Sequence, residues 1–398
     1  MVLSAGLGAV FWWVAARLFS AHSVGVAVAA ITTMSLVASL SFVGAGTVLI
    51  RDLHAAAGSK VRLAGTAVLA SGAVAAVAGT AAGIGAGAVN PALAEIGGSL
   101  IGLTVFVIGV ALTTMSKVVD EILLGLLRSV LVLSRNALFS VTKIVAVAIA
   151  AFLASPDQPL VIYVAWTISI VVSLSVIVPM LRRHWRPSLS FSWVDLKGIA
   201  PAAAGHQVLN TTLELPSLAI PAAVGLFAAP ATTAQFYMAF MLASAAFFIP
   251  TGLSGSLYAV GARRPELMLR QARMTIGLAL VATAAAVVGM IVLSEPLLRL
   301  FGDAYGDAAG IAPWLAAASI PLIVKDHFQV VARIRFRERL AVVVCGAGAV
   351  VELAAATVGL VAGGLPGLAI AWLAAVTVES LVMGSLMLTV ARSPARRS

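Results

Sequence analysis

FWWVAARLFSAHSVGVAVAAITTMSLVASLSFVGAGTVLIR, residues 11–51, contains two apolar runs separated by a short polar turn, Ser20-Ala21-His22-Ser23. About 20 apolar residues, at a rise of 1.5 Å each, cross a hydrocarbon core of roughly 30 Å. We therefore expect two membrane-spanning helices joined by the turn. Arg17 lies near the end of the first helix. A charge embedded in a membrane costs on the order of 3 kcal/mol, so Arg17 needs a partner, a wet cavity or an interface.

The composition of the whole chain is that of an integral membrane protein. Of its 398 residues, 61% are hydrophobic and 10% are charged, and the mean hydropathy is +1.09, whereas soluble proteins are about 25% charged. The apolar runs are continuous rather than alternating, which argues against a barrel. The net charge of +10 is interpreted as Lys and Arg in cytoplasmic loops, not as a nucleic-acid site. The single cysteine, Cys345, excludes disulfides and cysteine-based metal sites.

The hydropathy pattern predicts an all-α protein with about twelve transmembrane helices in two six-helix lobes. Residues 1–181 form the expected N-terminal lobe, residues 182–197 a cytoplasmic connector and residues 198–398 the C-terminal lobe. The spans are expected near 2–19, 24–50, 63–89, 97–127, 136–155, 160–181, 202–226, 233–259, 274–293, 311–332, 340–362 and 368–390. Basic residues gather in the loops after even-numbered spans, which predicts that both termini are cytoplasmic.

Two further features concern the organisation of the chain. No basic region precedes the first apolar run, so we expect a retained span rather than a cleaved signal. A weak internal repeat, at a shift of 208, places Arg17 opposite Gly225 and Lys117 opposite Lys325. It indicates either a parallel repeat with a site between the halves or a chance match in Ala/Val-rich sequence. Every connector is too short for a soluble domain, and no HExxH, GxSxG or paired-cysteine motif occurs, so we expect no enzyme.

Titratable residues inside the spans are the candidates for function, because such charges face a bundle interior or an aqueous path. They are Arg17, Lys117, Lys143, Lys325, Asp120, Glu121, Glu214, Asp326, Glu352, Glu379, His206 and His327. Asp120 and Glu121 have a second interpretation, local pairing at a cytoplasmic helix end. Lys325 and Asp326 are adjacent and point in different directions on a helix, so at least one of them needs another partner. Glu352 and Glu379 are interpreted as structural.

Glu214 is the most isolated of these acids. It lies in GHQVLNTTLELPSLAIP, residues 205–221, and Pro216 and Pro221 predict a bent or broken helix, which in transporters marks a moving or binding segment. The alternative is a carboxylic acid bonded to a neighbouring helix. Three GxxxG pairs are interpreted as sites of close helix packing: Gly79–Gly83, Gly98–Gly102 and Gly359–Gly363.

Short motifs resemble those of a known family, the polysaccharide transporters of the multidrug/oligosaccharidyl-lipid/polysaccharide exporter superfamily. In the opening hairpin they are Ala16-Arg17-Leu18-Phe19-Ser20 with Val24-Gly25, and Val43-Gly44-Ala45-Gly46-Thr47 with Ile50-Arg51. In the second half they are Leu215-Pro216, Ile220-Pro221, Ile249-Pro250, Ser256-Leu257, Leu300-Phe301-Gly302-Asp303-Ala304-Tyr305 and Gly367-Leu368-Ala369-Ile370-Ala371-Trp372. The resemblance implies a V-shaped, multi-pass transporter of the bacterial plasma membrane, in which the two lobes face each other.

The resemblance also implies a function. The protein would be a flippase for polyprenyl-diphosphate-linked saccharides, such as lipopolysaccharide O-antigen, capsule or exopolysaccharide repeat units. Such an anion crosses hydrocarbon only through a wet, partly cationic cavity that opens alternately to each side. The candidate cations are Arg17, Lys117 and Lys325, with Arg51 at the cytoplasmic mouth. Glu214 or Asp326 would couple transport to a proton or sodium ion. The expected partners are the lipid-linked oligosaccharide and membrane lipids, with no cofactor, resident metal or nucleic acid.

Three other functions stay open at this point. A multidrug and toxic compound extrusion-type antiporter would use intramembrane acids to exchange cations for organic cations. The embedded cationic residues argue against it, whereas Glu214 keeps it open. A polysaccharide polymerase would need a large outer loop, whereas the longest expected one is residues 294–310. A membrane scaffold that transports nothing would leave the embedded charges unexplained.

Overall fold

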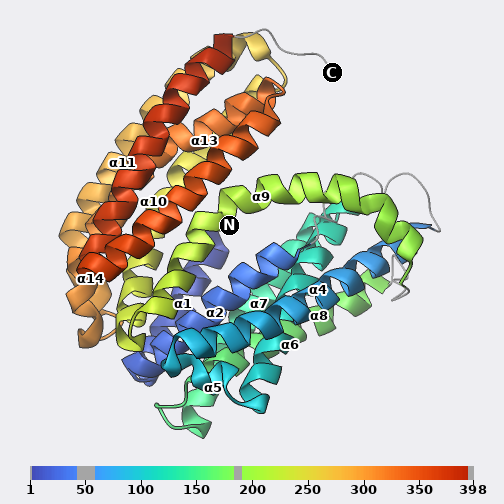
Figure 1. Cartoon of the computed structure of the whole chain (residues 1–398), viewed down its shortest axis with the longest axis vertical. Coiled ribbons are helices and arrows are strands. Elements are labelled where there is room, and N and C mark those ends of the chain that lie inside the picture. The colour runs from blue at the N-terminus through green and yellow to red at the C-terminus, as the bar shows by residue number, and fades with distance from the viewer. Residues whose placement is uncertain (1, 43–58, 183–190, 393–398) are drawn as a thin grey trace. The chain divides into compact units, whose positions relative to one another are not determined.

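The computed structural model describes residues 2–42, 59–182 and 191–392, and every long element in these ranges is an α-helix (Figure 1). Arg51, the Val43–Arg51 part of the hairpin motif and residues 183–190 of the expected connector lie outside the described residues. The side chain of His206 lies outside them as well. The prediction of an all-helical protein is confirmed.

Each expected span overlaps an observed helix, although the bounds differ by several residues in places. The first six are α1 (Val2–Leu18), α2 (Ala21–Ser41), α4 (Ser59–Val89), α6 (Leu100–Gly125), α7 (Ser129–Leu153) and α8 (Pro159–Arg182), with the short η1 (Pro91–Leu93) and α5 (Ala94–Gly97) between α4 and α6. The others are α9 (Trp193–Phe227), α10 (Pro230–Gly261), α11 (Met268–Arg299), the pair α12 (Ala312–Ala317) and α13 (Ser319–Ile334), and α14 (Glu338–Arg392), with the 3₁₀ turns η2 (Pro265–Leu267) and η3 (Asp303–Gly310). Nine of the described helices are long and apolar enough to cross a membrane.

The long helix α14 contains two spans, because it reverses direction at a glycine pair. Gly364 has φ 61° and ψ −150°, a backbone conformation that glycine adopts without steric cost. The two halves pack so closely that a Cβ on Gly359 would lie 2.4 Å from the carbonyl oxygen of Gly367. Close packing at Gly359 is therefore confirmed, with Gly367 rather than Gly363 as its partner.

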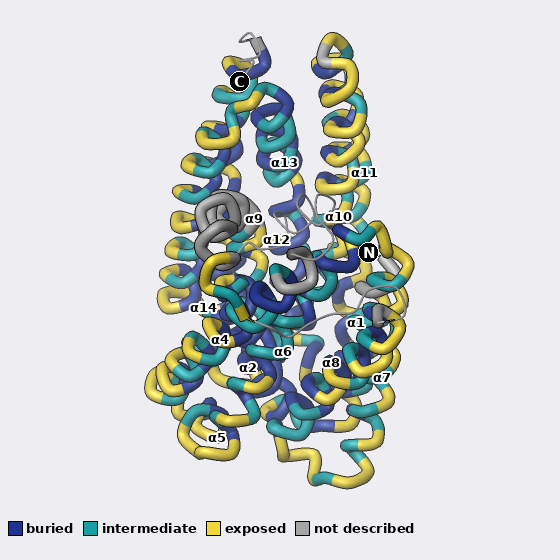
Figure 2. The backbone as a smooth tube through the Cα atoms, turned by 90° about the vertical axis from the view of Figure 1, so that its right-hand side faces the viewer, coloured by how far each residue is buried: buried dark blue, intermediate teal, exposed yellow. Residues whose placement is uncertain are grey.

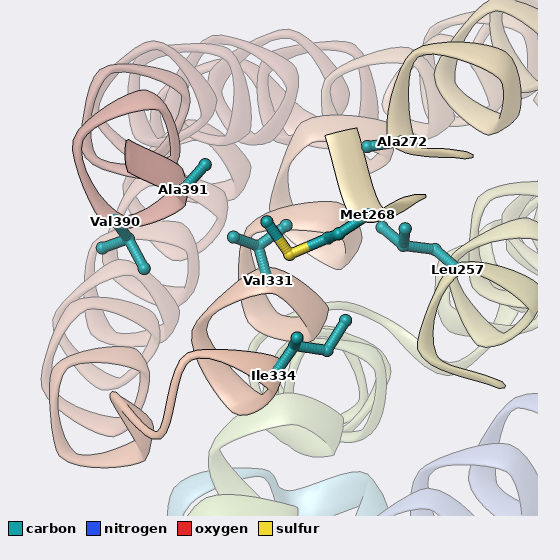
Figure 3. Packing of buried hydrophobic residues seen from close by; sticks show 7 residues of the cluster. All are labelled: Leu257, Met268, Ala272, Val331, Ile334, Val390 and Ala391. Carbon is teal, nitrogen blue, oxygen red and sulfur yellow. The ribbon is translucent and has the colours of Figure 1, made fainter. Parts of the chain in front are cut away.

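The chain divides into two compact units. The first comprises Met1–Thr211 and Pro221–Ala234, and the second comprises Thr212–Ile220 and Gln235–Ser398. Buried and exposed residues alternate along the helices of each unit (Figure 2), as expected for helices that bury one face. In the second unit, the ends of α10, α11, α13 and α14 meet in an apolar cluster of Leu257, Met268, Ala272, Val331, Ile334, Val390 and Ala391 (Figure 3).

The turn that joins α1 to α2 is fixed by Ser20. Its Oγ accepts a hydrogen bond from the backbone N–H of Ser23 at 3.3 Å, which caps α2. Its own backbone N–H donates to the carbonyl oxygen of Pro156 at 3.2 Å, in the turn between α7 and α8. The predicted helical hairpin is confirmed, and Ser20 joins it to a second hairpin of the first unit.

Helix α9 passes through Pro216 and Pro221 without a break. It is helical from Trp193 to Phe227 and visibly curved (Figure 1). Of the two expected shapes, bent or broken, the helix is bent. Its last turn is held in the first unit, where the Asn90 side-chain amide donates to the carbonyl oxygens of Gly225 at 3.1 Å and Ala228 at 3.2 Å.

Candidate functional site

Helix α13 of the second unit carries three consecutive titratable side chains, and each faces a different helix. Lys325 contacts α14, Asp326 contacts α10 and His327 contacts α11. Successive residues of an α-helix point about 100° apart, so one helix presents a charged or titratable group to each of its three neighbours. The prediction that Lys325 and Asp326 point in different directions, and that at least one of them needs another partner, is confirmed.

The Lys325 ammonium is buried between two carboxylates from the two halves of α14. Its Nζ lies 2.5 Å from Glu352 Oε1 and 3.2 Å from Glu379 Oε2, and the Lys325 residue is 3% exposed. The Oε1 atom of Glu379 has no hydrogen-bond partner among the described residues. One cation therefore faces two acids. Breaking a buried ion pair leaves an uncompensated charge, so this ion cluster fixes α13 against both halves of α14.

Trp372 completes the ion cluster. Its indole Nε1–H donates to Glu352 Oε2 at 2.8 Å, and its ring lies 6.1 Å from that of Phe240 and 5.9 Å from that of Phe247, between centroids. Both oxygens of Glu352 are therefore occupied. Since Trp372 belongs to the family-like motif at 367–372, this hydrogen bond gives a physical reason for an indole at that position.

We expect Trp372→Phe to lower the free energy of unfolding by about 1.5–3 kcal/mol, because the hydrogen bond to a buried carboxylate is lost while the aromatic packing remains. Thermal unfolding of the detergent-solubilised protein measures the change. Trp314→Phe is the matched control, since Trp314 is 49% exposed. Equal melting temperatures for the two variants would contradict this role for Trp372.

Asp326 and His327, the other two titratable residues of this α13 triplet, contact uncharged groups. The Thr251 hydroxyl donates to Asp326 Oδ2 at 2.9 Å. His327 Nδ1 lies 2.7 Å from the carbonyl oxygen of Ile323, and because a carbonyl only accepts, Nδ1 carries a proton. Its Nε2 lies 2.9 Å from Thr275 Oγ1. Asp326 is half-buried and His327 is fully buried.

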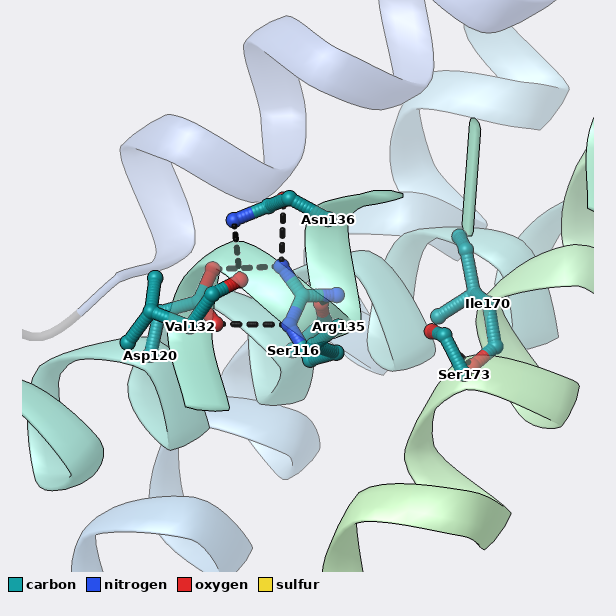
Figure 4. Close-up of polar contacts among 7 residues, drawn as sticks. All are labelled: Ser116, Asp120, Val132, Arg135, Asn136, Ile170 and Ser173. Atoms are coloured by element: carbon teal, nitrogen blue, oxygen red, sulfur yellow. Dashed lines mark hydrogen bonds and ion pairs between the residues drawn. The ribbon is translucent and has the colours of Figure 1, made fainter. Parts of the chain in front are cut away.

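In the first unit, the Arg135 guanidinium joins α7 to α6 (Figure 4). Its Nε and Nη2 donate to the two carboxylate oxygens of Asp120, and the Nε bond is 2.6 Å long. Nη1 donates to Ser116 Oγ at 2.7 Å, and Nη2 also donates to Asn136 Oδ1 at 2.9 Å. Such a bidentate pair is strong and directional. Asp120 is therefore engaged in a structural pair between neighbouring helices.

Lys143, also on α7, has a different environment. Its Nζ lies 4.2 Å from the ring centroid of Trp166, 5.0 Å from that of Phe139 and 5.2 Å from that of Phe11. The residue is 5% exposed. Among the described residues, no acid forms an ion pair with Lys143. The two buried lysines thus differ sharply: Lys325 has two carboxylates, and Lys143 has three aromatic faces.

The residues predicted to form the site lie in both units. Arg17 is exposed near the end of α1, on the stripe that also carries Gly6, Val10 and Trp13, and Lys117 is half-buried on α6. Both belong to the first unit, whereas Lys325 and Asp326 belong to the second. Glu214 is exposed on α9. A single cavity shared by Arg17, Lys117 and Lys325 stays a prediction, with the added condition that Glu352 and Glu379 would have to release Lys325.

Sequence comparisons find no match for this chain, whereas structure comparison does. A scan against models of protein families finds no match, and a search of curated proteins finds none either. Among solved structures, an inward-facing multidrug resistance MATE family transporter of the MOP superfamily matches with a TM-score of 0.74 and 15% identity, over 98% of this chain and 94% of that one. The chain has the fold of the MOP-superfamily transporters. The prediction of a two-lobe transporter fold is confirmed.

Two other solved structures also match this chain over nearly its whole length. The lipid II flippase MurJ in an inward closed conformation matches with a TM-score of 0.69 and 13% identity, over 98% of this chain and 88% of that one. A Vibrio cholerae MATE transporter matches with a TM-score of 0.60 and 14% identity, over 99% of this chain and 94% of that one. Drug transporters and a lipid flippase thus share this fold, so the fold alone does not identify the function.

Proposed function

We propose that the protein moves polyprenyl-diphosphate-linked saccharides across the bacterial plasma membrane by alternating access, with both termini in the cytoplasm. The polyprenyl tail stays in lipid, while the diphosphate and the glycan cross through a hydrated passage lined by Arg17 and Lys117, with Arg51 at its cytoplasmic mouth. The fold supports this proposal, because the lipid II flippase MurJ is among its structural neighbours.

The charge balance of the spans is the observation that carries the proposal. Asp120 is paired with Arg135, Glu352 binds both Lys325 and Trp372, and Asp326 accepts a hydrogen bond from Thr251. Glu379 shares Lys325 with Glu352, and its Oε1 has no hydrogen-bond partner among the described residues, so an organic cation would have to compete with Lys325 for this acid. Among the described residues, the buried charge with no ion-pair partner is a cation, Lys143. This balance favours an anionic cargo.

Flipping in vesicles tests the proposal. The purified protein is reconstituted into vesicles that contain a fluorescent undecaprenyl-diphosphate disaccharide, and the fraction exposed on the outer leaflet is followed over time. We expect the rate to exceed that of protein-free vesicles by about tenfold or more, which corresponds to a barrier lowered by about 1.4 kcal/mol or more. Equal rates with and without protein would contradict the proposal.

Ion coupling is assigned to Glu214 or Asp326. We expect Glu214→Gln or Asp326→Asn to abolish the dependence of flipping on an imposed proton or sodium gradient, because neither amide can exchange a proton or balance a bound cation. Flipping rates in vesicles with and without the gradient measure this. Glu295→Gln is the control, since Glu295 is exposed and paired with the exposed Arg299. If a variant keeps the gradient dependence of the parent, that residue is not the coupling site.

A second candidate function is a cation-coupled drug antiporter. It is favoured by the TM-score of 0.74 with a multidrug resistance MATE family transporter, which exceeds the value of 0.69 for MurJ. This function predicts export of ethidium from vesicles against an imposed sodium or proton gradient. Ethidium export without flipping of the lipid-linked disaccharide would replace the first function by this one.

A further inference from the structure

Lys143 lies far from the ends of its helix, and no acid among the described residues neutralises it. It is residue 15 of the 25 in α7, Ser129–Leu153. At 1.5 Å per residue it lies roughly 15 Å along the axis from the nearer end of the helix, Leu153. Lys143 as a whole is only 5% exposed. An ammonium has three N–H donors, and among the described residues none of them meets a hydrogen-bond acceptor or an acid. A cation kept at this depth has a functional rather than a packing explanation.

The aromatic rings stabilise the charge without using its hydrogen bonds. Phe11 comes from α1, Phe139 from α7 and Trp166 from α8. A ring face attracts a cation through its quadrupole. It leaves the N–H groups available to an oxygen that approaches from a side where no ring lies.

Such an open side lies at Gly8 of α1. A Cβ built on Gly8 would lie 4.0 Å from Lys143 Nζ, with no other atom of a neighbouring described segment within 4 Å. Larger side chains occur at most positions of α1, so the missing side chain at Gly8 leaves free space beside the buried ammonium. The opening therefore combines an unpartnered buried cation with free space beside it.

We propose that Lys143 and the space at Gly8 form a binding subsite for a phosphate group within the first unit. The subsite adds a binding residue to the proposed function. It rests on that function for the identity of the phosphate, which would be the diphosphate of the lipid-linked saccharide. Gly8 and Arg17 share α1, nine residues apart, which is roughly 14 Å along the helix. Nine residues at about 100° each also place Gly8 and Arg17 on opposite faces of α1, so the subsite consists of Lys143 and the opening at Gly8 without Arg17.

Binding of farnesyl diphosphate to the full-length protein in detergent tests the subsite. We expect Lys143→Met to weaken this binding by about tenfold or more, because a charge-assisted hydrogen bond is lost. Lys143→Arg should retain it, since a guanidinium also stacks on aromatic rings and binds phosphate. Gly8→Leu should weaken it as Lys143→Met does, by filling the opening while the charge of Lys143 is kept. Gly6→Leu is the matched control, because a Cβ on Gly6 meets nothing within 4 Å.

Comparing several ligands identifies the source of the phosphate. Inorganic diphosphate, phosphatidylglycerol vesicles and uncharged farnesol are compared with farnesyl diphosphate, and affinity that depends on Lys143 for any of the anions supports the subsite. Equal farnesyl diphosphate affinity in the parent, Lys143→Met and Gly8→Leu proteins would overturn it. A parent that flips the lipid-linked disaccharide while Lys143→Met flips it equally fast would also overturn it and leave the proposed function standing. A parent that binds farnesyl diphosphate through Lys143 but flips nothing would reject the proposed function alone.

Discussion

Lys325→Met should lower the free energy of unfolding of the second unit by about 3–5 kcal/mol, because removal of one partner of a buried ion pair leaves the other charge uncompensated. Here two carboxylates, Glu352 and Glu379, would be left in the interior. Thermal unfolding in detergent, followed by circular dichroism, measures the loss. Arg299→Met is the control. It breaks the ion pair between Arg299 and Glu295, which is exposed, and exposed pairs contribute about 0–1 kcal/mol.

Neutralising the whole ion cluster separates its structural role from its functional one. Lys325→Met combined with Glu352→Gln and Glu379→Gln removes every charge and keeps an oxygen that can accept from Trp372. We expect most of the lost stability to return, because neutral replacements of a buried ion network are often tolerated. An unfolding temperature of Lys325→Met alone equal to that of the parent would contradict the view that this cluster holds α13 to α14.

Gly25→Ala should lower the free energy of unfolding of the first unit by about 3 kcal/mol, the upper part of the range for overpacking. A Cβ on Gly25 would lie 1.7 Å from the carbonyl oxygen of Pro230 and 2.3 Å from its carbonyl carbon. These are backbone atoms, so no side-chain rotation relieves the clash, and the start of α2 must move away from the start of α10.

Gly6→Ala is the comparison for Gly25→Ala. It makes the same change in a helix, at a position with nothing within 4 Å. We expect it to raise the free energy of unfolding by up to about 1 kcal/mol, since alanine is the better helix former. Opposite signs for the two variants in one chemical-unfolding series are the predicted result. Equal effects would mean that the contact between Gly25 and Pro230 does not determine stability.

The spans themselves could be predicted, because the apolar runs that define them are local in sequence. The requirement that Lys325 find a partner other than Asp326 also followed from helix geometry. The identity of that partner did not, because Glu352 and Glu379 are 27 and 54 residues away. They meet Lys325 only because α14 reverses at Gly363 and Gly364, and hydropathy carries no sign of which faces such a reversal brings together.

Arg135 was missed for a simpler reason. The fifth span was expected to begin near Asn136, which placed Arg135 in a loop, whereas α7 begins at Ser129. Charged residues at a helix start lower the local hydropathy and so shorten the predicted span. A signal was present, since Asp120 needed a cation and Arg135 is the nearest basic residue on the next helix. For Lys143, the aromatic residue four positions earlier, Phe139, was the visible clue.

The sign of the charge that crosses the membrane tests the central claim most directly. Three probes with the same polyprenyl tail and the same disaccharide, joined through a diphosphate, an uncharged linker or a quaternary ammonium, are compared in reconstituted vesicles. The account predicts protein-dependent flipping of the diphosphate probe at about ten times the rate of the other two or faster. Equal rates for all three probes, or preference for the ammonium probe, would contradict it.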